Sequence, residues 1–234
     1  MGAIAAALQA CQDRIDGACG KAARGASCAT LLAVSKTFPE VAIREAWRAG
    51  QRRFGESYVQ EALGKIAALA DLPIEWHFIG PLQSNKTRPV AEHFSWVHAV
   101  EREKIARRLS EQRPPHLPPL NVCVEVNVSG EASKHGVPPR EALDLAEVVA
   151  CLPRLRLRGF MAIPEPTPET ALQRDRFRVL AGLLAEARAR GLDLDTLSMG
   201  MSDDLESAIL EGATLVRVGT AIFGARQYAQ TEQT

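Results

Sequence analysis

"LLAVSKTFPEVAIREAWRAG", residues 31–50, contains a strand followed directly by a helix. Residues 31–34 are apolar on both faces, as in a strand that helices cover. Pro39 suits the first turn of the following helix, and Gly50 suits its C-terminal end. The stretch therefore predicts one complete strand-and-helix unit.

The same pattern recurs along the rest of the chain. Strand-like runs occur at residues 31–36, 52–57, 75–80, 96–100, 121–128, 155–162, 196–201 and 215–220. Helical spacing fills the intervals, most clearly at 101–112 and 174–191, and an extra helix is expected at 3–16. Eight such units in 234 residues predict an α/β fold, a single (β/α)8 TIM barrel formed by residues 1–234. A doubly wound open sheet remains the alternative, because a strand count does not reveal closure.

Composition narrows the class of protein. The net charge is zero, with 24% charged and 46% hydrophobic residues, which argues against a nucleic-acid partner or an anionic membrane surface. No apolar run approaches the ~20 residues of a membrane span. The five cysteines, which are odd in number and widely spaced, are expected to be reduced thiols; they are Cys11, Cys19, Cys28, Cys123 and Cys151. The histidines show no metal-binding spacing. We therefore expect a cytoplasmic protein without a metal.

Lys36 is the first candidate for chemistry. The chain has 22 arginines and only 6 lysines, and it places one of these lysines at the end of the first predicted strand. Active sites of such barrels lie at the C-terminal ends of the strands. The lysine could lie along the core with its ammonium in water. Alternatively it is a desolvated, nucleophilic amine that can form a Schiff base. The local sequence leaves both interpretations open.

A possible phosphate site follows the last two predicted strands, where barrels frequently bind this group. In "GMSDDLESAIL", Ser202 occupies a predicted helix N-cap. Gly219 and Thr220 follow strand eight, where a glycine lets the backbone approach an anion closely. An ordinary capped helix and tight turn would explain the same residues. Arg217 shares a strand face with Gly219, and a surface salt bridge is its alternative role. A lysine opposite a phosphate cradle suggests a ligand with both an aldehyde and a phosphate.

Six longer motifs identify a family. "AVSKTFP", "FGESYVQE", "WHFIGPLQSNK", "EVNVSGEASKHG", "LSMGMSDDLESAI" and "VRVGTAIFG" together resemble the pyridoxal phosphate homeostasis protein family over nearly the whole chain. The resemblance implies a fold type III barrel, like the N-terminal domain of alanine racemase, that binds pyridoxal 5′-phosphate (PLP). Lys36 would form the Schiff base. Ser202 and the amides of Gly219 and Thr220 would hold the phosphate, and Arg217 would face the pyridine nitrogen.

The complete set of cofactor-binding residues that we expect is Lys36, Ser57, His77, Met199, Ser202, Arg217, Gly219 and Thr220. Two of these positions carry reservations. His77, taken by itself, is more typical of a core histidine than of a base. Ser57 stands where the family usually has asparagine, which puts the contact at this position in doubt. Lys86 and Lys134 are the lysines that would compete with Lys36 for the aldehyde.

The resemblance implies a non-enzymatic protein that carries or buffers PLP and supports vitamin B6 and amino-acid homeostasis. Apo forms of PLP-dependent enzymes would be its acceptors, and we expect a monomer. A PLP-dependent racemase is the main alternative, and a cofactor-free lysine aldolase acting on a sugar phosphate is another. Racemases of this fold complete their site with a tyrosine from a partner's β-domain. No such all-β segment follows the barrel before Thr234, and neither Tyr58 nor Tyr228 is an obvious replacement. We therefore expect no efficient catalysis.

Overall fold

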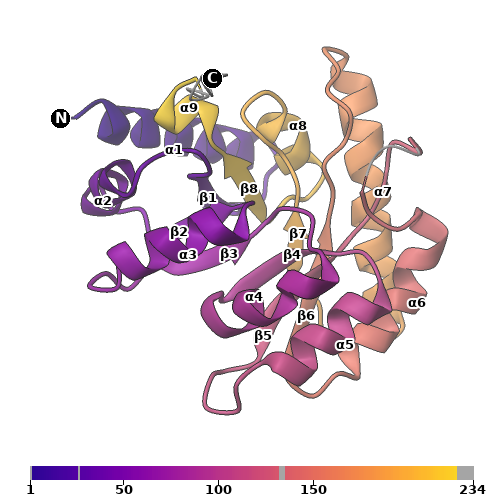
Figure 1. Ribbon diagram of the computed structural model, residues 1–234. Helices are drawn as coiled ribbons and strands as arrows, with labels where there is room; N and C mark the ends of the chain where they lie inside the picture. Colours follow the sequence, from indigo (N-terminus) through magenta and orange to yellow (C-terminus); the bar gives the residue numbers. More distant parts are fainter. Residues whose placement is uncertain (1, 26, 132–134, 226–234) are drawn as a thin grey trace, which may run out of the picture.

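The computed structural model describes residues 2–25, 27–131 and 135–225. Its parallel strands form a closed barrel in the order β1 to β8, with helices packed around the outside (Figure 1). The pairing of β1 with β8, in which Leu31 lies opposite Val216, closes the sheet. The predicted TIM barrel is thus confirmed, and the open sheet is excluded. That residues 1–234 form one domain remains a prediction.

All eight predicted strands are present. They are β1 (Thr30–Val34), β2 (Arg53–Glu56), β3 (Glu75–Phe78), β4 (Trp96–Val100), β5 (Leu120–Glu125), β6 (Leu155–Met161), β7 (Thr196–Ser198) and β8 (Leu215–Val218). The helices are α1 (Ala3–Lys21), α2 (Glu40–Arg48), α3 (Val59–Ala68), the 3-10 helix η1 (Ser84–Lys86), α4 (Thr87–His93), α5 (Glu103–Gln112), α6 (Pro139–Ala150), α7 (Thr170–Ala189), α8 (Leu205–Leu210) and α9 (Thr220–Phe223). The predicted N-terminal helix is confirmed and extends to Lys21.

Side chains of each strand alternate between the barrel interior and the layer of helices. In β1, Leu32 and Val34 form an interior cluster with Ile79 and Leu215. Ala33, between them, belongs to the much larger core that separates the sheet from the helices. Lys36 lies two residues after Val34, beyond the end of β1, and both residues line a cavity at the barrel mouth. The barrel therefore directs this lysine toward its own mouth.

Five strands end at least two residues before their predicted ends, and for β1 and β7 the reason is local. β1 ends at Val34, β3 at Phe78, β5 at Glu125, β7 at Ser198 and β8 at Val218. The backbone leaves the sheet soon afterwards, with a φ of 70° at Thr37 and 94° at Gly200. Such left-handed conformations do not continue a strand. The candidate site residues therefore lie in turns at the barrel mouth.

Helix α1 packs beside α2, α8 and α9 (Figure 1). The chain then returns to β1 so that the Cα atoms of Cys19 and Cys28 lie 5.7 Å apart, and these residues form a disulfide. The prediction of reduced thiols is wrong for this pair. The two cysteines are close because the chain turns between α1 and β1, and no spacing motif in the sequence indicates this pairing. Cys11, Cys123 and Cys151 are free thiols.

Candidate functional site

A cavity of about 480 Å³ opens at the C-terminal ends of β1, β7 and β8. Five of the predicted residues line it: Lys36, Ser202, Arg217, Gly219 and Thr220. They come from three separate segments of the sequence, and the closure of the barrel brings them to one place. Their role as cofactor-binding residues remains a prediction, but the structure shows that they share one cavity.

Three other predicted residues do not line this cavity. Ser57 lines a second cavity, near the ends of β2, β3 and β4, together with Lys86. His77 lines a cavity at the opposite, N-terminal end of the barrel. Met199 is fully buried in the core between sheet and helices. His77 lies within β3, before the strand end, and Met199 belongs to the core between sheet and helices. Their role in cofactor binding remains a prediction. Lys134 lies outside the described residues.

Sequence reasoning missed other residues of the Lys36 cavity, above all Arg14, Met201 and Asp203. Met201 lies two residues after the predicted Met199. Arg14 lies on α1, one residue before the fully buried Ile15. That position next to the buried face of the helix was the available signal, but it does not reveal which part of the barrel α1 covers.

The turn that carries Lys36 is held by main-chain and side-chain contacts. The Phe38 amide donates to the Ser35 carbonyl at 3.0 Å, which closes the turn around Lys36. The Thr37 amide donates to Glu61 Oε1 at 2.6 Å. Thr37 adopts a φ of 70°, a conformation that β-branched residues rarely adopt. These contacts fix the backbone on both sides of the half-buried Lys36.

A buried ion pair supports the same turn from the helix side. Lys65 Nζ donates to the Ser35 carbonyl and to Glu56 Oε1, each at 2.8 Å, and it also pairs with Glu61. Glu56 is fully buried, and burial raises the pKa of its carboxyl despite the nearby Lys65. Its Oε2 atom has no hydrogen-bond partner among the described residues. The Lys36 turn thus rests on a charged network inside the protein.

The turn that carries Ser202 is fixed from both of its sides. The Met201 amide donates to Asp204 Oδ1 at 2.6 Å. Arg14 Nη2 donates to the Ser202 carbonyl at 2.9 Å, while Arg14 also pairs with Glu206. Helix α8 begins at Leu205 with Asp204 at its N-cap, so the prediction of Ser202 as the N-cap is wrong. Ser202 instead belongs to the preceding turn at the cavity.

Arg217 is buried, with 3% of its surface exposed, which excludes the surface salt bridge. Its Nη1 donates to the Ser198 carbonyl at 2.6 Å and to Ser198 Oγ at 2.8 Å, and its Nη2 donates to the Ala162 carbonyl at 2.8 Å. Burial lowers the pKa of Arg217 to about 10, while Asp204 and Glu125 oppose this shift. The guanidinium therefore remains charged at neutral pH and adds a fixed cation to the cavity.

Gly219 lies where β8 comes close to β1. A Cβ at this position would lie 3.0 Å from the Val34 carbonyl oxygen. A side chain at this position would therefore require the Val34 backbone, which leads to Lys36, to shift by a few tenths of an ångström. The glycine keeps the two walls of the cavity close together.

Among the described residues, no group of three or more His, Cys, Asp or Glu side chains is arranged to hold a metal ion. In the same part of the chain, no helix is both long and apolar enough to cross a membrane. The lining of the Lys36 cavity includes a lysine amine, the hydroxyl groups of Ser202 and Thr220, the backbone at Gly219 and two arginines.

The fold and this cavity define a barrel of the alanine racemase N-terminal class. The family described as "Alanine racemase, N-terminal domain" matches residues 8–227. The structure of alanine racemase from Corynebacterium glutamicum is similar in fold, with a TM-score of 0.70 at 17% identity; the match covers 98% of this chain and 62% of that one.

Closer relatives give the family. The chain is 63% identical to the pyridoxal phosphate homeostasis protein of Pseudomonas aeruginosa over 97% of this chain and 98% of that protein. It is 53% identical to the Escherichia coli protein of the same name, over 98% of this chain and 100% of that protein. The structure of PipY from Synechococcus elongatus with PLP bound has a TM-score of 0.82 at 36% identity, over 94% of this chain and 100% of that one. This chain belongs to the pyridoxal phosphate homeostasis protein family.

Proposed function

We propose that this protein binds pyridoxal 5′-phosphate through Lys36 and carries or buffers it without turning over amino acids. The observation that carries this proposal is the single cavity that unites Lys36 with Ser202, Arg217, Gly219 and Thr220. The PLP-bound structure of the relative PipY supports the same ligand. We further propose that apo forms of PLP-dependent enzymes accept the cofactor, and that the protein is a cytoplasmic monomer.

The residues present fit this cofactor. The cavity volume of about 480 Å³ lies within the roughly 300–1,000 Å³ of small-molecule sites. When bound, PLP supplies an aldehyde that condenses with a lysine amine and a ring that withdraws electrons. The Ser202 and Thr220 hydroxyls and the backbone at Gly219 are suited to hold a phosphate, because its oxygens accept hydrogen bonds. Arg14, which donates to the Ser202 carbonyl, adds positive charge on the side of the cavity proposed to hold the phosphate.

Arg217 would also limit the chemistry of the ring. Its pKa of about 10 keeps the guanidinium charged, so a pyridine nitrogen beside it would stay unprotonated. An unprotonated ring is a weaker electron sink. A racemase also needs proton carriers on both faces of its substrate. Besides the arginines, Lys36 and Asp203 are the ionisable side chains in the described lining of the cavity. Tyr58 lines the other cavity. These observations favour holding the cofactor over turnover.

The first experiment identifies the attachment site. Protein mixed with PLP is reduced with borohydride, digested and analysed by mass spectrometry. We expect the adduct on Lys36, and we expect Lys36→Ala to lose the visible absorbance of the lysine-bound cofactor. Lys86→Ala, which changes a lysine of the other cavity, is the matched control and should behave like wild type. An adduct found mainly on Lys86 or Lys134 would refute Lys36 as the attachment site.

The second experiment separates a carrier from a racemase, the second candidate, which the likeness to alanine racemase favours. Solvent deuterium incorporation at Cα is measured for a panel of L- and D-amino acids, with free PLP as the control. We expect exchange no faster than that control. Transfer to an apo-enzyme is then followed in the presence of a phosphatase that destroys free PLP. Exchange far above the control and absent from Lys36→Ala would replace the carrier with the racemase.

A further inference from the structure

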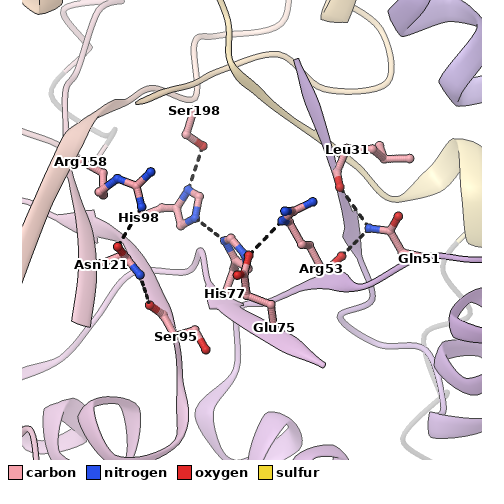
Figure 2. Close-up of polar contacts among 10 residues, drawn as sticks. All are labelled: Leu31, Gln51, Arg53, Glu75, His77, Ser95, His98, Asn121, Arg158 and Ser198. Atoms are coloured by element: carbon pink, nitrogen blue, oxygen red, sulfur yellow. Dashed lines mark hydrogen bonds and ion pairs between the residues drawn. The ribbon is translucent and has the colours of Figure 1, made fainter. Parts of the chain in front are cut away.

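A chain of side-chain hydrogen bonds crosses the barrel interior and ends at Arg217. Figure 2 shows its part from Glu75 to Ser198. It begins at Glu75, whose Oε1 lies 2.9 Å from His77 Nε2. His77 Nδ1 lies 2.9 Å from His98 Nε2, and His98 Nδ1 lies 2.8 Å from Ser198 Oγ. Ser198 Oγ in turn accepts from Arg217 Nη1 at 2.8 Å. Strands β4 and β7 are not neighbours in the sheet, so the bond between His98 and Ser198 spans the interior.

The two ends of the chain fix the direction of every hydrogen bond. An arginine can only donate, and an ionised glutamate can only accept. Because Ser198 Oγ accepts from Arg217, its own proton goes to His98 Nδ1. His98 then donates from Nε2 to His77 Nδ1, and His77 donates from Nε2 to Glu75. Both histidines are therefore neutral and carry their proton on Nε2.

The surroundings keep both histidines neutral. Both rings are fully buried, and burial lowers the pKa of His77 and, more strongly, that of His98. The His77 ring stacks on Trp96 with a centroid distance of 5.2 Å, and the Arg158 guanidinium lies over the same indole at 4.7 Å. The ring of His77 cannot rotate without breaking this stack. The residues between the two ends of the chain, His77, His98 and Ser198, are thus fully buried.

Glu75 is the end of the chain that water reaches. Its side chain is 39% exposed and lines the N-terminal cavity of about 340 Å³. The hydrogen bond from His77 lowers the pKa of its carboxyl, and Arg53 also donates to Oε1 at 3.0 Å. Arg53 on β2, Arg158 on β6 and Asp195 before β7 are the other charged groups at this cavity. The opposite end, Arg217, lines the Lys36 cavity.

We propose that Glu75, His77 and His98 are positioning residues that act through Ser198 on Arg217. They hold the guanidinium in one orientation and make its ligand-facing side sensitive to the charge at the far end of the barrel. Within the part of the chain that the structure describes, Arg217 donates three hydrogen bonds, so two of its five N–H groups remain for a ligand. The proposal rests on the proposed function in one respect, namely that the ligand's pyridine nitrogen faces Arg217.

A reversed chain shows why the two ends are coupled. A proton on Nδ1 of His77 would force His98 to accept at Nε2 and donate from Nδ1. Ser198 Oγ would then receive two donors, and its own hydrogen would lose its acceptor. The lost hydrogen bond would therefore be at Ser198, the residue that accepts from Arg217 and orients it. Loss of the negative charge of Glu75 moves the chain toward this state, because that charge favours the proton on His77 Nε2.

The test compares Glu75→Gln with Asp195→Asn. Both substitutions remove a carboxylate from the N-terminal cavity, but Asp195 lies outside the chain. With PLP bound, the ¹⁵N chemical shift of a labelled pyridine nitrogen and the Kd for PLP are measured. We expect Glu75→Gln to move the pyridine signal and to weaken binding roughly 2- to 30-fold, the range typical of coupling through hydrogen-bonded networks. Asp195→Asn should leave both quantities unchanged. Wild-type values in Glu75→Gln, or equal changes in the two variants, would overturn the proposal.

A second measurement uses the protein without ligand and so separates this proposal from the proposed function. Ring ¹⁵N spectra of the histidines should show the Nε2–H tautomer for both His77 and His98. Glu75→Gln should shift these signals and the Arg217 Nε–H resonance, whereas Asp195→Asn should not. If wild type failed to bind PLP, the proposed function would be refuted, but these spectra would still test the hydrogen-bond chain from Glu75 to Arg217. The Nδ1–H tautomer at His98 would refute it.

Discussion

The ammonium of Lys65 lies 2.8 Å from the main-chain oxygen of Ser35, the residue immediately before Lys36. The same ammonium neutralises Glu56, a fully buried carboxylate. A lysine on α3 therefore supports the backbone of a lysine at the barrel mouth. The buried charge is costly by itself, and its arrangement at this turn connects the stability of the fold to the geometry of the site.

This relationship predicts that Lys65→Met strongly destabilises the protein. The substitution leaves Glu56 buried without its counterion, which typically costs about 3–5 kcal/mol of unfolding free energy. The double variant Lys65→Met with Glu56→Gln should recover a large part of this loss, because no buried charge remains. Urea denaturation measures both, and Lys104→Met on the exposed side of α5 serves as the control. Equal stability of Lys65→Met and Lys104→Met would show that the network contributes nothing.

The barrel could be predicted from the sequence because each strand-and-helix unit carries local signals. Alternation along β8 also placed Arg217 and Gly219 on one face, and the structure has both at the Lys36 cavity. Local pattern says nothing about which distant residues meet. The contact of Arg14 with Ser202 joins residues 188 positions apart, and that of His98 with Ser198 joins residues 100 positions apart. Only the closed barrel determines these contacts.

The same limit explains two errors. The Cys19–Cys28 disulfide depends on how the segment after α1 returns to β1, and the spacing of the two cysteines has no recognisable signature. Ser202 looked like an N-cap because a hydroxyl residue precedes a helix. Asp204 takes that position instead, and its carboxylate accepts from the Met201 amide in the turn before the helix. Two competing cap residues within three positions cannot be ranked from sequence.

Ser202→Ala should weaken PLP binding by one to two orders of magnitude. The substitution removes one hydrogen bond to a charged group, which is worth roughly 1.5–3 kcal/mol, and each 1.4 kcal/mol is about tenfold in Kd. Absorbance titration gives the affinity. Pyridoxal, which lacks the phosphate, is the control ligand and should bind wild type and variant equally weakly. If wild type bound pyridoxal and PLP with equal affinity, Ser202 would have no phosphate to hold.

The disulfide predicts a redox-dependent stability. Opening the loop between Cys19 and Cys28 should lower the unfolding free energy by roughly 3 kcal/mol, because the unfolded chain gains entropy. The double variant Cys19→Ser, Cys28→Ser should lose the same amount and become insensitive to reductant, whereas Cys151→Ser, at an exposed thiol, should match wild type.

Thiol titration of the denatured, unreduced protein gives the direct check on the disulfide. Three reactive thiols are expected, from Cys11, Cys123 and Cys151. Five reactive thiols would contradict the disulfide. Since a reducing cytoplasm opens most disulfides, the oxidised fraction in cells also tests the proposed location.

Glu125 predicts how stability depends on pH. This residue at the end of β5 is buried, and burial together with the charge of Glu101 raises the pKa of its carboxyl from 4.5 to about 7, against the opposing effect of Arg217. The folded state therefore favours the protonated carboxyl. The stabilisation from Glu125 is complete below about pH 4.5 and is lost as the pH rises through about 7.

Glu125→Gln, which stays neutral at every pH, should avoid this loss. Relative to wild type, the variant should gain roughly 3 kcal/mol between acidic and mildly alkaline pH, at about 1.4 kcal/mol per pKa unit. Urea denaturation of both proteins at about pH 5 and about pH 8 measures the difference, and Glu111→Gln, at an exposed position of α5, is the matched control. A stability difference between wild type and Glu125→Gln that is the same at both pH values would mean that Glu125 titrates normally and does not face a desolvated barrel mouth.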